Sequence, residues 1–273
     1  SEQQIENLLV PRNLSASVPL YERWWNWLTD IVLHWNWGVS PTGGSVNEQI
    51  AYRAWVSAEL VLGATIIATV IGIALGVYTA SRQYKLADRL VQGISIITMN
   101  INIIVAALAI VILAINFNQW VGERVFYVTG SSSEGVTGFF PVLVDALQHL
   151  ILPTIALVIT GYAGTYFLQR SLLLDNIKAD YVRTARAKGL TKQQAIRKHA
   201  LRTSLIPVAT QVAFTIPTVF TGAILTETIF AWQGMGRYFL TTINGNDIHG
   251  VVAVAAFGAV LTAIGAILAD IAV

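Results

Sequence analysis

Five long apolar stretches without a charged residue constrain this chain more than any other feature of its sequence. They cover Leu60–Ser81, Leu90–Gly122, Ala146–Gln169, Thr203–Thr226 and Ile248–Ala269. Each has about 20 residues or more, the length that an α-helix needs to cross a hydrocarbon core of about 30 Å. Because no water is present there to bond the backbone, helices are the structure that such stretches adopt. The sequence therefore predicts an all-α polytopic membrane protein with five transmembrane helices.

The composition argues against a soluble protein with buried helices. Only 12% of the 273 residues are charged, whereas about 25% is usual in soluble domains. A soluble chain would also have to contain all five apolar windows by chance. The chain has no cysteine, which excludes disulfides, thiolate metal sites and thiol catalysis.

Two basic loops determine the expected orientation. The loops Ser81–Arg89 and Arg170–Arg202 together hold 12 of the 17 Lys and Arg residues. By the positive-inside rule both loops face the cytoplasm, and two apolar windows separate them, which is the even number that this requires. We therefore expect residues 1–54 to form an external segment, residues 55–273 to form the transmembrane domain, and residues 170–204 to be cytoplasmic.

An external N-terminus has to be carried across the membrane. The sequence begins at Ser1, and no signal peptide precedes that residue. We therefore expect an earlier transmembrane helix before residues 1–54, so that the parent protein has six.

The second basic loop has the pattern of a folded helical hairpin. Its first helix is predicted over Asp175–Lys188, with Asp175 as a possible N-cap. One mostly apolar stripe is expected along it at helical spacing, formed by Ile177, Tyr181, Ala185 and Lys188. Small residues lie on the same helix, and small residues let another protein surface approach closely. This pattern favours a docking element over a solvated loop whose charges only fix the topology.

A glycine turn separates this helix from the next one. Gly189 stands where a helix ends in a left-handed residue, and Leu190 is expected to cover the apolar stripe at that turn. Thr191 and Gln194 fit a capping box that starts a second helix, over Lys192 to about Arg202. The order helix, glycine turn, helix distinguishes the loop from a disordered basic tail.

These residues resemble the EAA loop of permease subunits in binding-protein-dependent ATP-binding cassette (ABC) importers. DYVRTARAKGL followed by HALRTSLIPV is most similar to the dipeptide and oligopeptide branch, whose members are DppB/OppB-like. The segments ETIFAWQGMGRYF and, more weakly, WNWGVSPTGGSVNEQI also resemble that branch. The glycine and its spacing match the loose family pattern. Arg183 replaces the glutamate of that pattern and its terminal proline is missing, as is usual in the peptide branch.

The resemblance implies an ABC type I importer permease fold and a non-catalytic subunit of the bacterial inner membrane. Such a subunit forms half of the translocation pathway with a second homologous permease. Two ATPase subunits bind ATP and Mg, an extracytoplasmic peptide-binding protein delivers the substrate, and lipid surrounds the helices. No cofactor, metal or nucleic acid is expected on this chain. The coupling helix that docks on an ATPase would comprise Asp180, Tyr181, Arg183, Thr184, Ala185, Arg186, Ala187, Lys188 and Gly189.

The fourth window and its end supply candidates for the pathway wall, because that segment mixes threonine, glycine and aromatic residues. The candidates are Gln211, Thr215, Thr218, Thr221 and Glu227. A carboxylate beside a span is a functional hypothesis by default. For Glu227, pairing at a helix end is an equally good interpretation. Gly72 and Gly76 have a spacing that is typical of close helix contacts.

Other functions stay open on the residues alone. The chain has no GxxxxGKS/T phosphate loop, HExxH motif or GxSxG elbow, so it is not predicted to be an enzyme. A stand-alone secondary transporter or channel predicts midplane charges and internal repeats, and no repeat is found. A structural scaffold predicts no effect of the hairpin on ATPase output. Within the importer class, nickel chelates, glutathione or another small solute are alternatives to peptide.

Overall fold

The computed structural model describes residues 6–7, 9–10, 15, 17–41, 44–133 and 135–272, and the side chains of residues 215–222 and 272 lie outside that description. These residues form helices and a single isolated bridge, between Val39 and Ser45, with no β-strand among them. The elements are α2 (Leu20–His34), α3 (Val46–Ser81), α4 (Leu86–Asn100), α5 (Ile103–Val121), α6 (Phe139–Ile177), α7 (Asp180–Ala187), α8 (Lys192–Ala195), the π-helix η1 (Ile196–Ala200), α9 (Leu201–Gly222), α10 (Ile224–Ile229), α11 (Met235–Asn244) and α12 (Ile248–Ala272). The predicted all-α class is confirmed.

Four helices of the described chain are long and apolar enough to cross a membrane, namely α3, α5, α6 and α12. The 36 residues of α3 and the 39 residues of α6 make rods of roughly 54 Å and 58 Å at 1.5 Å per residue. Both rods therefore exceed a hydrocarbon core of about 30 Å, and their ends extend into the interface or beyond it. Helix α9 occupies the window that the sequence marks at Thr203–Thr226.

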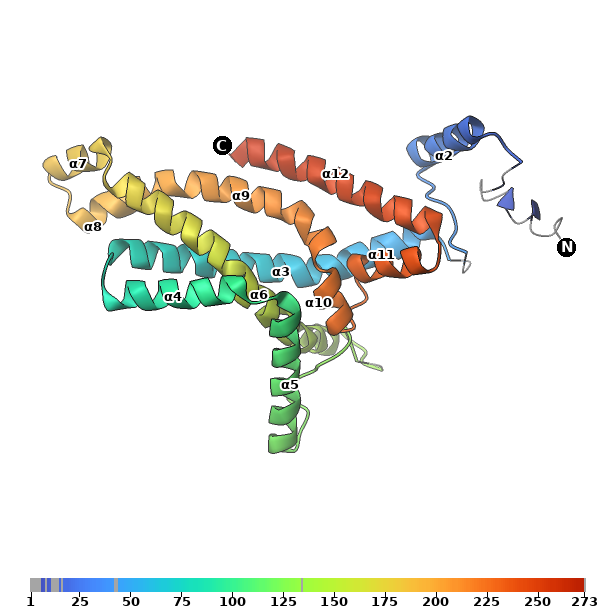
Figure 1. The fold of residues 1–273 in the computed structure, drawn as a ribbon, viewed down its shortest axis with the longest axis horizontal. Coiled ribbons are helices and arrows are strands. Elements are labelled where there is room, and N and C mark those ends of the chain that lie inside the picture. Colours follow the sequence, from blue (N-terminus) through green and yellow to red (C-terminus); the bar gives the residue numbers. More distant parts are fainter. Residues whose placement is uncertain are drawn as a thin grey trace.

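The centre of the bundle is the crossing of α3 and α6, which is visible in Figure 1. At Gly72, an added Cβ would lie 2.8 Å from the backbone oxygen of Tyr162 on α6, and at Gly76 it would lie 3.0 Å from the Gln169 side chain. Two backbones approach this closely only where a side chain is missing on one of them. The predicted helix-contact role of the two glycines is confirmed.

The window Leu90–Gly122 is not one span, so the prediction of a single helix there is wrong. Helix α4 ends at Asn100, and α5 begins at Ile103 and runs across the direction of the bundle in Figure 1. Asn102 caps α5, because its side chain accepts a hydrogen bond from the Ile104 N–H at 2.8 Å. The polar residues Asn100 and Asn102 give the backbone a local alternative to one continuous helix.

The two basic loops lie at the same end of the molecule. In Figure 1 the α3–α4 connection lies at the left end with α7 and α8, whereas α2 and α11 lie at the right end. This arrangement is the one that the even number of crossings between the loops requires. The bundle therefore has one strongly basic end.

Candidate functional site

The basic hairpin, Lys178–Arg202, begins later than predicted. Helix α6 continues through Asp175 to Ile177, the chain leaves helical geometry at Ala179 (φ −66°, ψ 149°), and α7 starts at Asp180. The predicted helix over Asp175–Lys188 with an Asp175 cap is therefore wrong at its start. The physical reason is packing: Leu174 and Ile177 on the last turns of α6 contact the apolar cluster under the hairpin, which favours continuation of α6.

One face of α7 is turned toward the bundle. Val182 is 2% exposed and Ala185 is 7% exposed, and both pack with Leu173 and Ile196 in that cluster. The predicted stripe is thus right for Ile177 and Ala185, which pack in the cluster, and wrong for Tyr181 and Lys188, which are exposed. Val182 takes the inner position next to Tyr181. The opposite face carries Tyr181, Thr184, Arg186, Ala187 and Lys188, all of which are exposed. Of the residues predicted for docking, Ala185 alone faces inward.

The predicted glycine turn and capping box are both present. Gly189 has φ +96°, and nothing lies within 4 Å of an added Cβ, so the left-handed backbone and not space requires the glycine. The Gly189 N–H donates to Arg186 and the Leu190 N–H donates to Ala185, which is the Schellman pattern. Leu190 covers the apolar cluster, and Thr191 and Gln194 exchange the two hydrogen bonds of the box. The hairpin is therefore an ordered element.

The outer face of α7 carries positive charge that its own helix does little to neutralise. Arg183 lies 3.6 Å from Asp180, but both side chains are more than half exposed, at 76% and 95%. Such a pair contributes little to stability. Within the described part of the chain, Arg186 and Lys188 form no ion pair. A cationic face with a small residue, Ala187, and a threonine suits contact with an acidic protein surface.

A buried ion pair that sequence reasoning missed holds α4 to α6 near the hairpin. Arg170 donates from Nε and from a terminal nitrogen to the two oxygens of Asp88, both at 3.0 Å. Burial raises the pKa of the Asp88 carboxyl, but hydrogen bonds from Arg170 and from the Tyr84 N–H outweigh that effect and hold the pKa below its ordinary value. The sequence feature that could have indicated this ion pair is that Asp88 is the single acidic residue in the first basic loop, Ser81–Arg89.

At the other end of the bundle, Glu227 of α10 is fully buried. One of its carboxylate oxygens accepts from the Ser57 hydroxyl of α3 at 2.6 Å, and the other accepts from the Arg237 N–H at 2.8 Å. The Ser57 oxygen in turn accepts from the Met235 N–H at 2.7 Å. These two groups bind N–H groups in the first turn of α11, where a helix has free donors and favours negative charge. We call Ser57, Glu227, Gly234, Met235 and Arg237 the carboxylate clasp.

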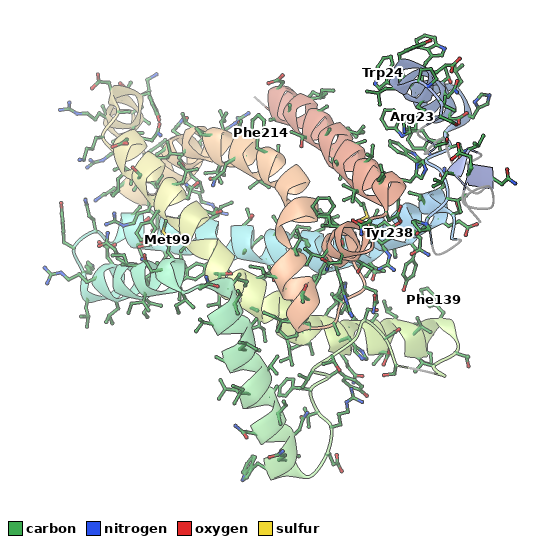
Figure 2. The ribbon with its side chains drawn as sticks, turned by 45° about the vertical axis from the view of Figure 1, so that its right-hand side comes forward. Arg23, Trp24, Met99, Phe139, Phe214 and Tyr238 are labelled. Atoms are coloured by element: carbon green, nitrogen blue, oxygen red, sulfur yellow. The ribbon has the colours of Figure 1, made fainter. Side chains whose placement is uncertain are left out.

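The glycines of ETIFAWQGMGRYF are explained by this packing. A Cβ on Gly234 would overlap the Glu227 carboxylate and the Ser57 hydroxyl, and a Cβ on Gly236 would come within 2.8 Å of the backbone of Ile224. Trp232 is 1% exposed and donates from its indole nitrogen to the Val56 oxygen at 2.9 Å. Figure 2 shows Tyr238 where α11 meets α3, and Arg53 stacks over its ring there. Glu227, a predicted pathway residue, therefore lies in a closed contact in this structure.

A cavity of about 330 Å³ opens between α3, α6 and α9. Gln211 lines it, together with hydroxyl-bearing residues of α3 and α6, which are Thr65, Thr69, Thr160 and Thr165. Of the other predicted pathway residues, the side chains of Thr215, Thr218 and Thr221 lie outside the described residues. The cavity combines weakly polar groups with an apolar wall, which suits passing contacts with a polar solute better than tight binding.

His149 is packed in the interior of the bundle, near the start of α6. It is 2% exposed, its Nδ1 lies 2.9 Å from the backbone oxygen of Asp145, and the Tyr127 ring lies 4.5 Å away. No group of three or more metal-ligating side chains is found within the ranges that the structure describes.

Long apolar helices and a basic hairpin at one end define a multi-pass helical membrane protein. The chain belongs to the family of binding-protein-dependent transport system inner membrane components, whose pattern matches residues 72–273. It is thus a permease component of a binding-protein-dependent importer.

Three named members of this family are similar in sequence to the chain over most of its length. The oligopeptide transport system permease protein OppB of Mycobacterium tuberculosis is 36% identical over 260 residues, which is 95% of this chain and 80% of that protein. The oligopeptide permease AppB of Bacillus subtilis is 33% identical, over 93% of this chain and 78% of its own length. The dipeptide permease DppB of Escherichia coli K12 is 31% identical, over 86% and 73%. The resemblance predicted from the sequence is confirmed.

Proposed function

We propose that this chain is one of two homologous permease subunits of an ATP-driven peptide importer in the bacterial inner membrane. Residues 1–54 lie outside, residues 55–273 form the transmembrane permease domain, and its loop at residues 170–204 is cytoplasmic. Each permease subunit contributes half of the translocation pathway. ATP and Mg are bound by two partner ATPase subunits, this chain holds no cofactor, and an extracytoplasmic binding protein delivers the peptide.

The observation that carries this proposal is the two-sided construction of the basic hairpin. Its inner face, with Val182 and Ala185, is packed on the bundle, and its outer face, with Tyr181, Thr184 and Ala187, is bare. A rigid element held on one side and exposed on the other transmits the movement of a partner as a rigid body. An ATPase cleft that accepts α7 contacts the exposed outer face of that helix. The basic residues around α7 then determine how the helix is oriented in the cleft.

The cavity beside Gln211 supports a role in translocation. Helix α9 continues directly from η1 and α8, so the wall that holds Gln211 is connected to the hairpin through one helical run. The hydroxyl groups of Thr65, Thr69 and Thr160 can form hydrogen bonds with a peptide without discriminating between its side chains. Such a wall suits peptides of varied sequence, with selection left to the binding protein. Peptide as the substrate is further supported by the names of the relatives.

The test is to block the outer face of α7 without touching its inner face. Ala187→Trp places a large ring on the exposed surface, and we expect loss of ATPase co-purification and of peptide uptake. Ala51→Trp, on an exposed residue of α3 at the opposite end of the bundle, is the matched control and should keep ATPase recovery normal. Normal ATPase recovery and normal uptake with Ala187→Trp would contradict the coupling role of α7.

A further inference from the structure

A second pocket, of about 390 Å³, lies at the basic end of the molecule. The α3–α4 connection forms one side of it, and the last turn of α6 and the first residues of α8 form the other. We call it the lysine pocket; its lining residues include Arg82 and Lys85 from the first basic loop and Lys178 and Lys192 from the hairpin. The pocket thus joins two basic loops that are about 90 residues apart in the sequence.

The positive charge of the lysine pocket is not balanced by an acid. No Asp or Glu is among its lining residues. The nearby Asp88 is already bound by Arg170. Within the described part of the chain, Lys85, Lys178 and Lys192 take part in no ion pair. Arg82 is turned toward Tyr78, whose hydroxyl it contacts at 2.7 Å. Three lysines without an acidic partner line one hollow, and this excess of positive charge attracts an anion.

Apolar surface continues directly from the pocket. Its lining residues also include Leu174, Ile177 and Ile196. Tyr84, which also lines the pocket, is 75% exposed, and Leu86 and Leu90 on the first turns of α4 are 73% and 56% exposed. The pocket also lies where α3 ends, and the apolar window of α3 runs to that end at Ser81, which is headgroup depth if the helix spans the bilayer. A free phosphate ion uses only the charges, whereas a phospholipid uses the charges and the apolar surface together.

We propose that the lysine pocket binds the phosphate headgroup of an anionic phospholipid from the cytoplasmic leaflet, with the acyl chains lying along α4. The inference rests on the orientation proposed above and adds a ligand to this chain. Because Lys85 belongs to the bundle and Lys178 and Lys192 belong to the hairpin, a bound headgroup connects the two. Its presence fixes the hairpin against the bundle and so makes coupling of ATP hydrolysis to transport dependent on anionic lipid.

The experiment uses the complete transporter in nanodiscs of phosphatidylcholine, with or without phosphatidylglycerol, and measures lipid retained after delipidation by native mass spectrometry. The test variant is Lys178→Gln with Lys192→Gln, which removes two charges. Near an anionic surface each such charge changes binding severalfold, so we expect about thirtyfold weaker phosphatidylglycerol retention for the pair. Lys198→Gln, an exposed lysine of η1 outside the pocket, is the control and should retain the lipid normally.

ATPase activity and subunit recovery separate this proposal from its competitors. We expect phosphatidylglycerol to stimulate peptide-dependent ATP hydrolysis in the unmodified transporter and in the control, and not in the double variant. Equal lipid retention by the double variant and the control would overturn the proposal. So would competition by inorganic phosphate alone in phosphatidylcholine, which indicates a free-anion site. Loss of ATPase subunits with unchanged lipid retention would also overturn it, because the pocket would then be part of the ATPase contact.

Discussion

The basic hairpin and the carboxylate clasp carry the two segments that most resemble peptide permeases, and they are built in opposite ways. The hairpin directs its charges outward and rests on a small apolar cluster through Val182 and Ala185. The clasp directs its charge inward, where Glu227 joins α3, α10 and α11 and is fully buried. The hairpin thus has an exposed face, whereas in the clasp Arg237 is partly exposed and the other members are buried.

The comparison shows that likeness to a family does not by itself indicate contact with a partner. In the clasp Gly234 is required by the approach of Glu227 and Ser57, and in the hairpin Gly189 is required by a left-handed turn with open space around it. A resemblance of the first kind reflects close packing inside the fold, and one of the second kind reflects the shape of an exposed turn. The degree of burial of the residues in each segment distinguishes these two kinds of resemblance.

The largest effect on stability is expected from Gly234→Ala. The new methyl group overlaps the Glu227 carboxylate and the Ser57 hydroxyl, so the clasp has to separate and leave a buried carboxylate without its partners. We expect a loss of about 3 kcal/mol or more in the free energy of unfolding, seen as a lower melting temperature in detergent. Gly93→Ala on α4 is the control, because nothing lies within 4 Å of its added Cβ, and it should be neutral or stabilising. Equal melting temperatures for the two variants would contradict the clasp.

An intermediate effect is expected from a double-mutant cycle on Ser57→Ala and Glu227→Gln. The hydrogen bond of 2.6 Å between these side chains is buried and charge-assisted, so we expect a coupling free energy of about 1.5 kcal/mol. Ser57→Ala combined with Thr184→Ala on the hairpin should be additive, because those sites lie at opposite ends of the bundle. A coupling energy near zero for the first pair would show that the bond does not stabilise the fold.

The smallest effect on global stability is expected from Ala185→Glu. A carboxylate on the inner face of α7 cannot stay in the apolar cluster, so the hairpin should detach locally while the spans remain folded. We expect trypsin to cleave within Lys178–Arg202 about tenfold faster, with little change in melting temperature. Thr184→Glu, one residue away on the exposed face, should leave the cleavage rate unchanged. Similar cleavage rates for the two variants would contradict the assigned faces.

Local chemistry is what the sequence predicted best. The Gly189 turn, the covering Leu190 and the capping box of Thr191 and Gln194 depend on residues within a few positions of one another, and all are present. The helix start at Asp180 was missed because the packing of Leu174 and Ile177 outweighs the capping preference of Asp175. The break before Asn102 was missed because one capping side chain hardly changes the hydropathy of a long window.

A single sequence did not indicate which side chains far apart along the chain contact each other. Glu227 drew attention as a carboxylate beside a span, but Ser57, its partner, is 170 positions away. Arg170 and Asp88, 82 positions apart, each looked like an ordinary charge of a basic loop. In both cases the residue type indicates the need for a partner. The packing of α10 and α11 on α3 determines the partner of Glu227, and the packing of α4 on α6 determines the partner of Arg170.

Helices α8, η1 and α9 follow one another without leaving helical geometry, since Ala195, Ile196, Ala200 and Leu201 all have right-handed helical dihedrals. Residues 192–222 therefore make a single shaft of roughly 45 Å. Between Lys192 and Gln211 two features permit bending of the shaft, namely the π-helix η1 and Pro207, which lacks a backbone N–H. Because the run is continuous, the start of α8 beside Thr191 and the cavity wall at Gln211 belong to one helical element, so a displacement of one end is carried along the helix axis to the other.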